Sequence, residues 1–293
     1  MKKLALALVL LAEVSAFASA PEDGWTGTCA KFHSPSQPKL NADYCIYSDP
    51  ASTGSDVLYY LSGRGSGATM WVEEAQGIRA RWKSLGLPTP TVVTISFDLN
   101  PVIWWVLLDH NHDGSTGLYP VFVDEFMPMV EKQLGGVQGR RLLIGRSMGG
   151  FNASQLLLRR PKDFARVALL CPAILTLSPY ADAAEDEAYI QRSGASPLFL
   201  FLVKFFFRSS LENEQNWMEV SPLEQGRTAL GADTPPLHVS CGEEDHYGFH
   251  DGAHEFAKLA RSLSAHEVLW QSLKGNHCTF DPAAIADFIL SNR

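Results

Sequence analysis

The sequence predicts an α/β fold in which helices cover both faces of a mostly parallel central sheet. Short apolar segments, typical of buried strands, alternate with longer segments whose apolar residues recur every three or four positions. The strand segments are apolar throughout, as expected where both faces of a sheet are covered. No internal repeat or second domain interrupts this alternation, so we expect a single domain.

The composition restricts the class of function. The chain has 293 residues, of which 46% are hydrophobic, and this is enough to bury a sizeable core. A net charge of -8, without any long run of lysine or arginine, argues against a nucleic-acid surface. We therefore expect no nucleic-acid partner.

The N-terminal segment, residues 1–20, resembles a secretory signal. Lys2 and Lys3 give it a basic start, an apolar run follows at 4–11, and small residues lead up to Ala20. The apolar run is too short to span a membrane. We expect cleavage after about Ala20, a secreted or periplasmic protein and a folded domain at 21–293; the alternative is an ordinary amphipathic helix.

The expected strands are short apolar segments followed by turn residues, and the first part of the domain, 25–47, is expected to contain two irregular strands. The expected helices have apolar residues on one face; Trp71, Ala75, Ile78 and Trp82 show this spacing. The regular strands are expected at 56–61, 91–97, 141–144, 166–171, 237–241 and 267–271. The helices are expected at 70–85, 118–134, 151–160, 252–263 and 282–290.

The sequence Gly145-Arg146-Ser147-Met148-Gly149 lies between the apolar strand 141–144 and the helix 151–160. This is the context of a nucleophile elbow, a tight strand-to-helix turn that exposes a serine hydroxyl. Glycines flank the serine because the backbone must approach closely there. We expect Ser147 to be a catalytic nucleophile; the alternative is a structural glycine turn.

A serine nucleophile needs a base and an orienting carboxylate, which in this architecture follow later strands in the order acid, then histidine. His277 follows Gly275 at the end of the last strand and is the expected base. The acid lies among Glu243, Glu244 and Asp245, and the residues alone do not separate these three. The nearby histidines at 246, 250 and 254 are expected at the surface.

The oxyanion of an acyl-transfer reaction needs two backbone N–H donors. The first is expected from Met148, directly after the nucleophile, and the second from Arg64 in the glycine-rich turn after strand 56–61. The alternative for this turn is a flexible loop without a role.

From about residue 57 to 288 the chain resembles the esterase branch of the α/β-hydrolases. This group includes esterase D-like S-formylglutathione hydrolases, secreted feruloyl and acetyl esterases, and mycolyltransferases. The resemblance implies a Ser-His-Asp triad and places the acid at Asp245, with Glu244 in reserve. Ser62 and Arg64 depart from the residues usual in the oxyanion turn. The matching segments are 59–63, 122–128, 145–151, 161–164, 241–245 and 275–277.

Between strands 166–171 and 237–241 the chain leaves the sheet for longer than a usual connection, which predicts a cap or lid at about 173–217. The segment 197–207 is strongly apolar but too short to span a membrane. We expect it to face the substrate; the alternatives are core packing and contact with a membrane surface.

The segment from Asp109 to Gly114 matches the start of a calcium loop, but Pro120 occupies the position of the bidentate glutamate. An EF-hand is therefore excluded. We expect a polar turn near the mouth of the active site, with a looser metal site as the alternative.

Five cysteines are present, and export would allow disulfides to form. We expect the pairs Cys29–Cys45 and Cys241–Cys278, with Cys171 as a buried thiol. The alternative is that all five are reduced.

These observations together predict a secreted serine carboxylesterase that acts on a small or lipid-like ester through an acyl-enzyme. Ser147 attacks, His277 transfers the proton and Asp245 orients His277, so no cofactor or metal is required. The alternatives are an acyltransferase with the same triad and a hydrolase-fold binding protein without catalysis. Contact with a membrane surface through the cap is not predicted.

Overall fold

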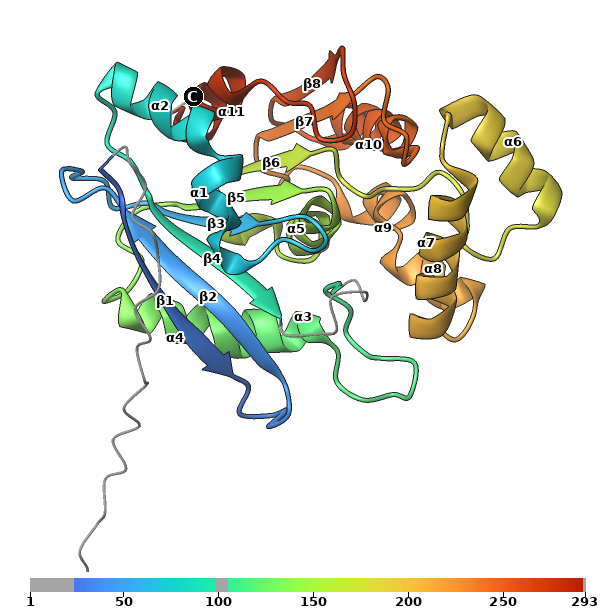
Figure 1. Ribbon diagram of the computed structural model, residues 1–293, viewed down its shortest axis with the longest axis horizontal. Helices are drawn as coiled ribbons and strands as arrows, with labels where there is room; N and C mark the ends of the chain where they lie inside the picture. Colours follow the sequence, from blue (N-terminus) through green and yellow to red (C-terminus); the bar gives the residue numbers. More distant parts are fainter. Residues whose placement is uncertain (1–23, 98–104, 292–293) are drawn as a thin grey trace, which may run out of the picture.

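The computed structural model describes residues 24–97 and 105–291, and the expected signal segment at 1–20 lies outside these ranges. The described residues form an eight-stranded sheet in the order β1-β2-β4-β3-β5-β6-β7-β8 (Figure 1). β1 and β2 are antiparallel to their neighbours, and the remaining strands are parallel. The strands are β1 (Thr26–His33), β2 (Asn41–Ser48), β3 (Val57–Leu61), β4 (Thr91–Phe97), β5 (Arg141–Arg146), β6 (Arg166–Leu170), β7 (Leu237–Gly242) and β8 (Val268–Leu273).

Helices cover both faces of the sheet, which confirms the predicted α/β class. Every residue of β3, β6 and β7 is buried, as the continuous apolar runs predict. Alternate residues of β3 enter two separate cores: Tyr59 packs with Phe122 and Phe151, whereas Tyr60 packs with Trp71. The main helices of the domain are α1 (Trp71–Glu74), α2 (Gln76–Leu85), α3 (Leu118–Pro120), α4 (Met127–Gln133), α5 (Met148–Arg159), α10 (Phe249–Leu263) and α11 (Pro282–Leu290).

The expected helix at 70–85 is interrupted. It begins as a 3-10 turn (Ala68–Met70), continues as α1 and breaks at Ala75 before α2. The buried Arg79 explains how the break is tolerated, because its guanidinium donates hydrogen bonds to the carbonyls of Trp71 (2.9 Å) and Val72 (2.7 Å). The expected helix at 118–134 likewise contains a π-helical segment, Val121–Phe126, between α3 and α4.

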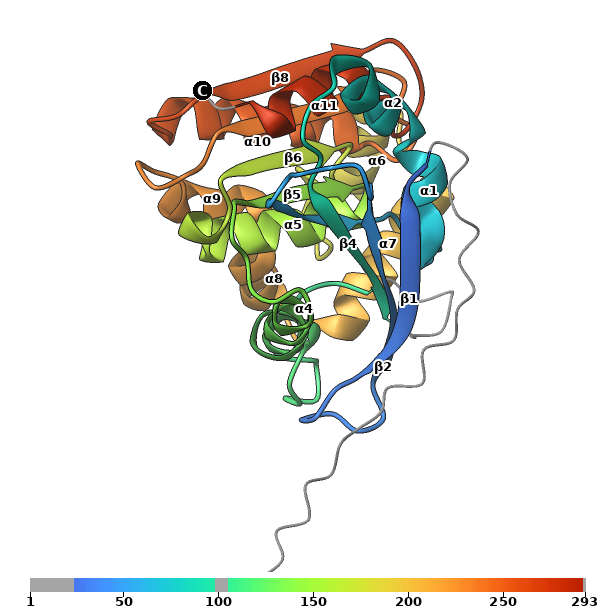
Figure 2. The ribbon, with the colours of Figure 1, turned by 90° about the vertical axis from the view of Figure 1, so that its left-hand side faces the viewer.

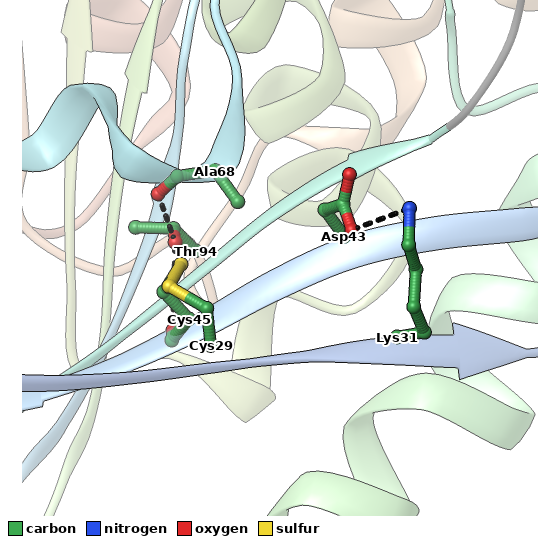
Figure 3. Close-up of a disulfide and its surroundings, with 6 residues drawn as sticks. All are labelled: Cys29, Lys31, Asp43, Cys45, Ala68 and Thr94. Carbon is green, nitrogen blue, oxygen red and sulfur yellow. Dashed lines mark hydrogen bonds and ion pairs between the residues drawn. A yellow bond between two sulfur atoms is a disulfide. The ribbon is translucent and has the colours of Figure 1, made fainter. Parts of the chain in front are cut away.

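The N-terminal hairpin is more regular than the sequence predicts. β1 and β2 are both eight residues long and pair without interruption, so that Cys29 lies directly opposite Cys45. These two residues form the predicted disulfide (Figure 3). Two positions along, Lys31 and Asp43 form an exposed cross-strand ion pair of 2.8 Å. Figure 2 shows that β1 and β2 run steeply across the direction of β8, at the other edge of the twisted sheet.

The connection between β6 and β7 consists of helices. A capping box at Asp182 begins α6, and the buried Lys204 of α7 pairs with Asp186 of α6. Figure 1 shows α6, α7 and α8 beyond the ends of β5 and β6, whereas α9 packs against α5 and α10. The helices of this connection are α6 (Ala183–Ser193), α7 (Pro197–Ser210), α8 (Glu214–Val220) and α9 (Pro222–Ala229).

The apolar helix α7 has two different faces. Phe199 and Phe207 are buried in the main core, whereas Phe201 (63% exposed) and Phe205 (64% exposed) stack on each other at the surface. Core packing therefore explains only one face of this segment. Among the described residues, no helix has both the length and the apolar character needed to cross a bilayer.

Candidate active site

Ser147 occupies a tight turn between β5 and α5. Its backbone angles, φ 55° and ψ -116°, are unusual for a residue with a side chain. The flanking glycines permit the turn, since a Cβ on Gly149 would lie 1.9 Å from the carbonyl oxygen of Leu61 and one on Gly145 would lie 2.3 Å from that of Gly149. The local geometry is therefore that of the nucleophile elbow expected from the sequence.

The structure brings together the three side chains singled out in the sequence. Ser147 Oγ lies 2.8 Å from His277 Nε2, and His277 Nδ1 lies 2.7 Å from Asp245 Oδ2. The side chain of Asp245 is fully buried, and that of His277 is 14% exposed. A hydroxyl, an imidazole and a carboxylate are thus connected in series, which is the arrangement that lets the imidazole remove the hydroxyl proton.

Asp245 and His277 meet because their loops follow the neighbouring parallel strands β7 and β8. Two backbone hydrogen bonds join these loops, from Glu243 to Leu273 (2.8 Å) and from Glu244 to Gly275 (2.9 Å). Glu243 and Glu244 are exposed, whereas Asp245 is buried. The structure therefore brings Asp245, and neither adjacent glutamate, into contact with the histidine.

His277 is enclosed by aromatic rings and polar partners. The Tyr247 ring stands nearly perpendicular to the imidazole with centroids 4.4 Å apart, and Phe249 lies at 5.7 Å. Burial by itself would lower the pKa of His277. Its hydrogen bonds, first to Asp245 and then to Cys278, outweigh this effect and raise the pKa to about 9. The imidazole is thus held as a stronger base than an exposed histidine.

The other histidines of this region have different environments. His246 and His254 are exposed, and His254 stacks on Trp270. His250 is half-buried and its Nε2 lies 2.9 Å from Ser272 Oγ. The Ser147 hydroxyl contacts His277 and none of these three.

The turn that should supply the oxyanion donors lies beside the nucleophile. A Cβ on Gly63 would lie 3.4 Å from Ser147 Cβ, so the end of β3 approaches the serine directly. Gly65, with φ 74°, allows the chain to reverse after Arg64. Met148 is the first residue of α5, whose N-terminal N–H groups favour negative charge.

Comparisons with known proteins identify the family of the chain. The model of the family described as "Putative esterase" matches residues 40–284. The chain belongs to this esterase family. It is a carboxylic ester hydrolase of the serine hydrolase type. No curated protein matches the chain.

Solved structures show the same fold at low sequence identity. An S-formylglutathione hydrolase from Agrobacterium tumefaciens has a TM-score of 0.65 and 17% identity, with 94% of this chain and 95% of that chain covered. A ferulic acid esterase has a TM-score of 0.57 and 20% identity, with 90% and 94% covered. Carboxyl esterase 2 from Tuber melanosporum has a TM-score of 0.62 and 14% identity, with 92% and 83% covered. These similarities support the α/β-hydrolase fold of the esterase.

The expected disulfide between Cys241 and Cys278 is wrong: both residues are free and buried in the esterase. Cys241 Sγ lies 3.3 Å from Asp245 Oδ2, and Cys278 Sγ lies 3.2 Å from His277 Nε2. The two sulfurs therefore contact different members of the Asp-His pair. Cys171 is a buried thiol, as expected. The sequence showed the cysteines near the triad but not that their thiols contact it.

A network of polar side chains beneath the nucleophile was not predicted from the sequence. Arg146 of the esterase, next to Ser147, forms an ion pair with Glu74 of α1. The same carboxylate accepts hydrogen bonds from the hydroxyls of Tyr60 (2.6 Å) and Ser66 (3.2 Å). This network ties the elbow to α1 and to the segment after β3. The signal for it in the sequence is Arg146, a charged residue at the variable position before the serine of the Gly-x-Ser-x-Gly pattern.

The predicted polar turn at 109–114 is stabilised by an ion pair with α5 and by local hydrogen bonds. Asp109 forms an ion pair with Arg159, and Asp113 accepts hydrogen bonds from the N–H (3.0 Å) and hydroxyl (2.6 Å) of Ser115. Within the described ranges, the side chains whose ligand atoms are close enough to share a metal ion lie around Cys171 instead.

Proposed function

We propose that the esterase cleaves its substrate through an acyl-enzyme formed on Ser147. The observation that carries the proposal is the continuous series of short contacts from Ser147 Oγ through His277 to Asp245. Ser147 attacks the ester carbonyl while His277 Nε2 accepts the hydroxyl proton, and Asp245 stabilises the resulting imidazolium. His277 returns the proton to the leaving alcohol. Water then attacks the acyl-enzyme while His277 accepts its proton, and the acid leaves as that proton passes back to Ser147.

The proposed oxyanion hole consists of the N–H groups of Met148 and Arg64. The position of Met148 at the start of α5 and the closeness of Gly63 to the nucleophile support this assignment. Both donors belong to segments that lie beside Ser147, where negative charge develops on the carbonyl oxygen. The proposed mechanism needs no cofactor.

The proposed nucleophile is tested by labelling the mature protein with a fluorophosphonate probe. Ser147→Ala should abolish labelling and lower kcat/KM for a simple ester by at least about 10^4-fold, because the remaining groups provide no nucleophile. Ser154→Ala is a matched control, since this buried serine lies in α5, the helix that follows the elbow, and its hydroxyl donates a hydrogen bond to the carbonyl of Phe151. Labelling that persists in Ser147→Ala, or is absent from the wild type, would contradict the proposal.

The helices α6 to α8 are proposed to form the cap; they begin within the predicted insertion at about 173–217 and end at Val220. Phe199 supports this assignment because its ring packs 4.0 Å from that of Tyr247, which in turn packs on His277. The buried face of α7 therefore reaches the surroundings of the base. In a series of esters of increasing acyl length, Phe199→Ala should alter the preferred length and Phe201→Ala, on the exposed face, should not. Equal preferences in all three proteins would contradict a substrate-facing cap.

Export is proposed from the N-terminal segment, and the Cys29–Cys45 disulfide supports an oxidising compartment. N-terminal sequencing of the exported protein should begin at about Pro21. A mature protein that still begins at Met1 would contradict cleavage.

A further inference from the structure

The acid and the base of the proposed triad are surrounded by three free cysteines that the proposed mechanism does not use. Cys171 follows β6, Cys241 lies in β7, and Cys278 follows His277 directly. All three are at least 92% buried, with exposed fractions of 0%, 0% and 8%. A buried thiol usually serves as a small apolar group. Here, however, the Cys278 sulfur contacts the Nε2 atom that must also contact the nucleophile.

The backbone marks two of these cysteines as unusual. Among the non-glycine residues that the structure describes, only Ser147 (φ 55°), Cys171 (φ 44°) and Cys278 (φ 60°) have positive φ angles. This conformation is disfavoured for residues with a Cβ and persists where the surrounding structure fixes it, often at functional sites. Cys171 and Cys278 therefore share with the nucleophile a positive φ angle, which is uncommon for residues with a side chain.

We propose that Cys171, Cys278 and His277 form a site for a thiophilic d10 cation, for which Zn²⁺ is the probe, and that occupancy of this site switches the esterase off. The potential ligand atoms are the two Sγ atoms and the Nε2 of His277, and all three lie within 4.8 Å of one another. The inference rests on the proposed function only in its second part, the loss of activity.

The spacing of these atoms suits such an ion. Zinc binds thiolate sulfur at about 2.3 Å and imidazole nitrogen at about 2.0–2.1 Å, so tetrahedral ligands are separated by roughly 3.5–3.8 Å. The 3.2 Å between Cys278 Sγ and His277 Nε2 needs only a small adjustment. Two cysteines and one histidine, with a fourth position left open, form a known type of ligand set for zinc.

The binding step balances in charge and protons. Two S–H bonds break, together with the Nε2–H bond of His277 wherever that ring is protonated. Each of these protons leaves to solvent, and two Zn–S bonds and one Zn–N bond form without any change of oxidation state. The two thiolates cancel the charge of the divalent ion, which matters in a buried site. His277 can keep its Nδ1 contact with Asp245 (2.7 Å), an arrangement typical of histidines that bind metals.

Occupancy would remove the base from the nucleophile. In the free protein the Nε2 atom of His277 lies 2.8 Å from Ser147 Oγ and can accept its proton. A metal bound at Nε2 uses the lone pair that proton acceptance requires. The cation would therefore inhibit by occupying the base, and removing it would restore activity.

Two other uses of the same thiols are separate outcomes of the test. A disulfide between Cys171 and Cys278 would require an external two-electron oxidant, whereas binding of the cation requires none. A second trio, formed by Cys171, Cys241 and Asp245, also has its ligand atoms within 4.8 Å of one another. That trio leaves Nε2 of His277 uncoordinated, and it offers a carboxylate oxygen in place of the imidazole nitrogen. The first trio matches the preference of zinc for sulfur and nitrogen more closely.

The activity test is a zinc titration of the mature protein, with each variant compared with its own metal-free activity. Wild type should lose activity with zinc and regain it with a chelator. Cys171→Ala and Cys278→Ala should each raise the half-inhibitory concentration by about 10–100-fold or more, since even loss of a group that only supports a ligand has effects of that size. Cys241→Ala, the matched control, should remain sensitive. Loss of sensitivity in Cys241→Ala alone, or recovery with a thiol reductant but not with a chelator, would overturn the proposal.

A second measurement separates the metal site from the proposed function. Co²⁺ added to Ser147→Ala, which has no nucleophile, should give thiolate charge-transfer absorption and the visible bands of a tetrahedral ion. Cys278→Ala in the same background should weaken both. Absence of these bands from Ser147→Ala would overturn the metal site whatever the esterase assays show. If the bands appear but wild type lacks triad chemistry, only the proposed function fails.

Discussion

The five cysteines occupy two regions of one sheet and behave differently in each. At the antiparallel edge, Cys29 and Cys45 lie directly opposite each other on β1 and β2 and form a disulfide. In the parallel part, Cys171, Cys241 and Cys278 lie at or after the ends of strands and stay free. The antiparallel register places one cysteine opposite another. At the ends of the parallel strands, the cysteines instead contact the Asp-His pair.

This difference separates stability from chemistry. In the hairpin, side chains on neighbouring strands lie opposite each other and can form a covalent bond. The disulfide formed there lies away from the loops after β7 and β8 that carry the triad residues. The ends of parallel strands instead present loops at one edge, where active sites of such folds form. We therefore expect changes in the hairpin to alter the free energy of unfolding and changes at the strand ends to alter turnover.

The largest expected effect is at the strand ends, in Asp245→Asn. The amide keeps the shape of the carboxylate but favours the wrong histidine tautomer and cannot stabilise the imidazolium, so kcat should fall by about 10^4-fold. The carboxylate also accepts the N–H of Tyr247 at 2.8 Å, a bond that the amide oxygen can preserve. Steady-state kinetics and thermal unfolding together should show lost turnover in a folded protein. Glu244→Gln is the control, and an equal loss there would contradict Asp245 as the acid.

The next effect is in the hairpin, in the double variant Cys29→Ala/Cys45→Ala. The disulfide joins residues separated by 16 positions, and opening a loop of about this size should lower the free energy of unfolding by about 3 kcal/mol. Denaturant unfolding measures this change, and kcat/KM at low temperature should stay near the wild-type value. Lost turnover in a protein of unchanged stability would break the proposed separation between the two regions.

The sequence predicts much of the fold and of the candidate site. Strand positions follow from continuous apolar runs because the parallel strands are buried on both faces, as β3 and β6 show. The elbow at Ser147 follows from glycines whose replacement would bring a side chain into neighbouring carbonyls. The choice of Asp245 over Glu244 came from family resemblance, and in the structure burial distinguishes them.

The remaining features depend on contacts between distant segments. Arg79 supports the break at Ala75 by binding carbonyls of the preceding turn, which the helical spacing of apolar residues does not reveal. The wrong disulfide has the same origin. Cys241 and Cys278 both lie near the triad, but the direction of each sulfur depends on how the β7 and β8 loops pack. Proximity in the chain predicts the neighbourhood of a thiol and not its partner.

The smallest expected effect is a shift of the pH profile in Cys278→Ala. His277 must be neutral to accept the Ser147 proton, so kcat/KM should fall as the pH drops below the pKa of His277, which is raised to about 9. Among the causes that raise this pKa, the contact with Cys278 comes after that with Asp245. Its removal should move the acidic midpoint down, toward the usual histidine value of about 6.5, and preserve activity to lower pH. Cys278→Ser, which keeps a hydrogen-bonding group beside Nε2, should shift the midpoint less. A midpoint that rises or stays unchanged in Cys278→Ala would contradict the expectation that this thiol raises the pKa of the base.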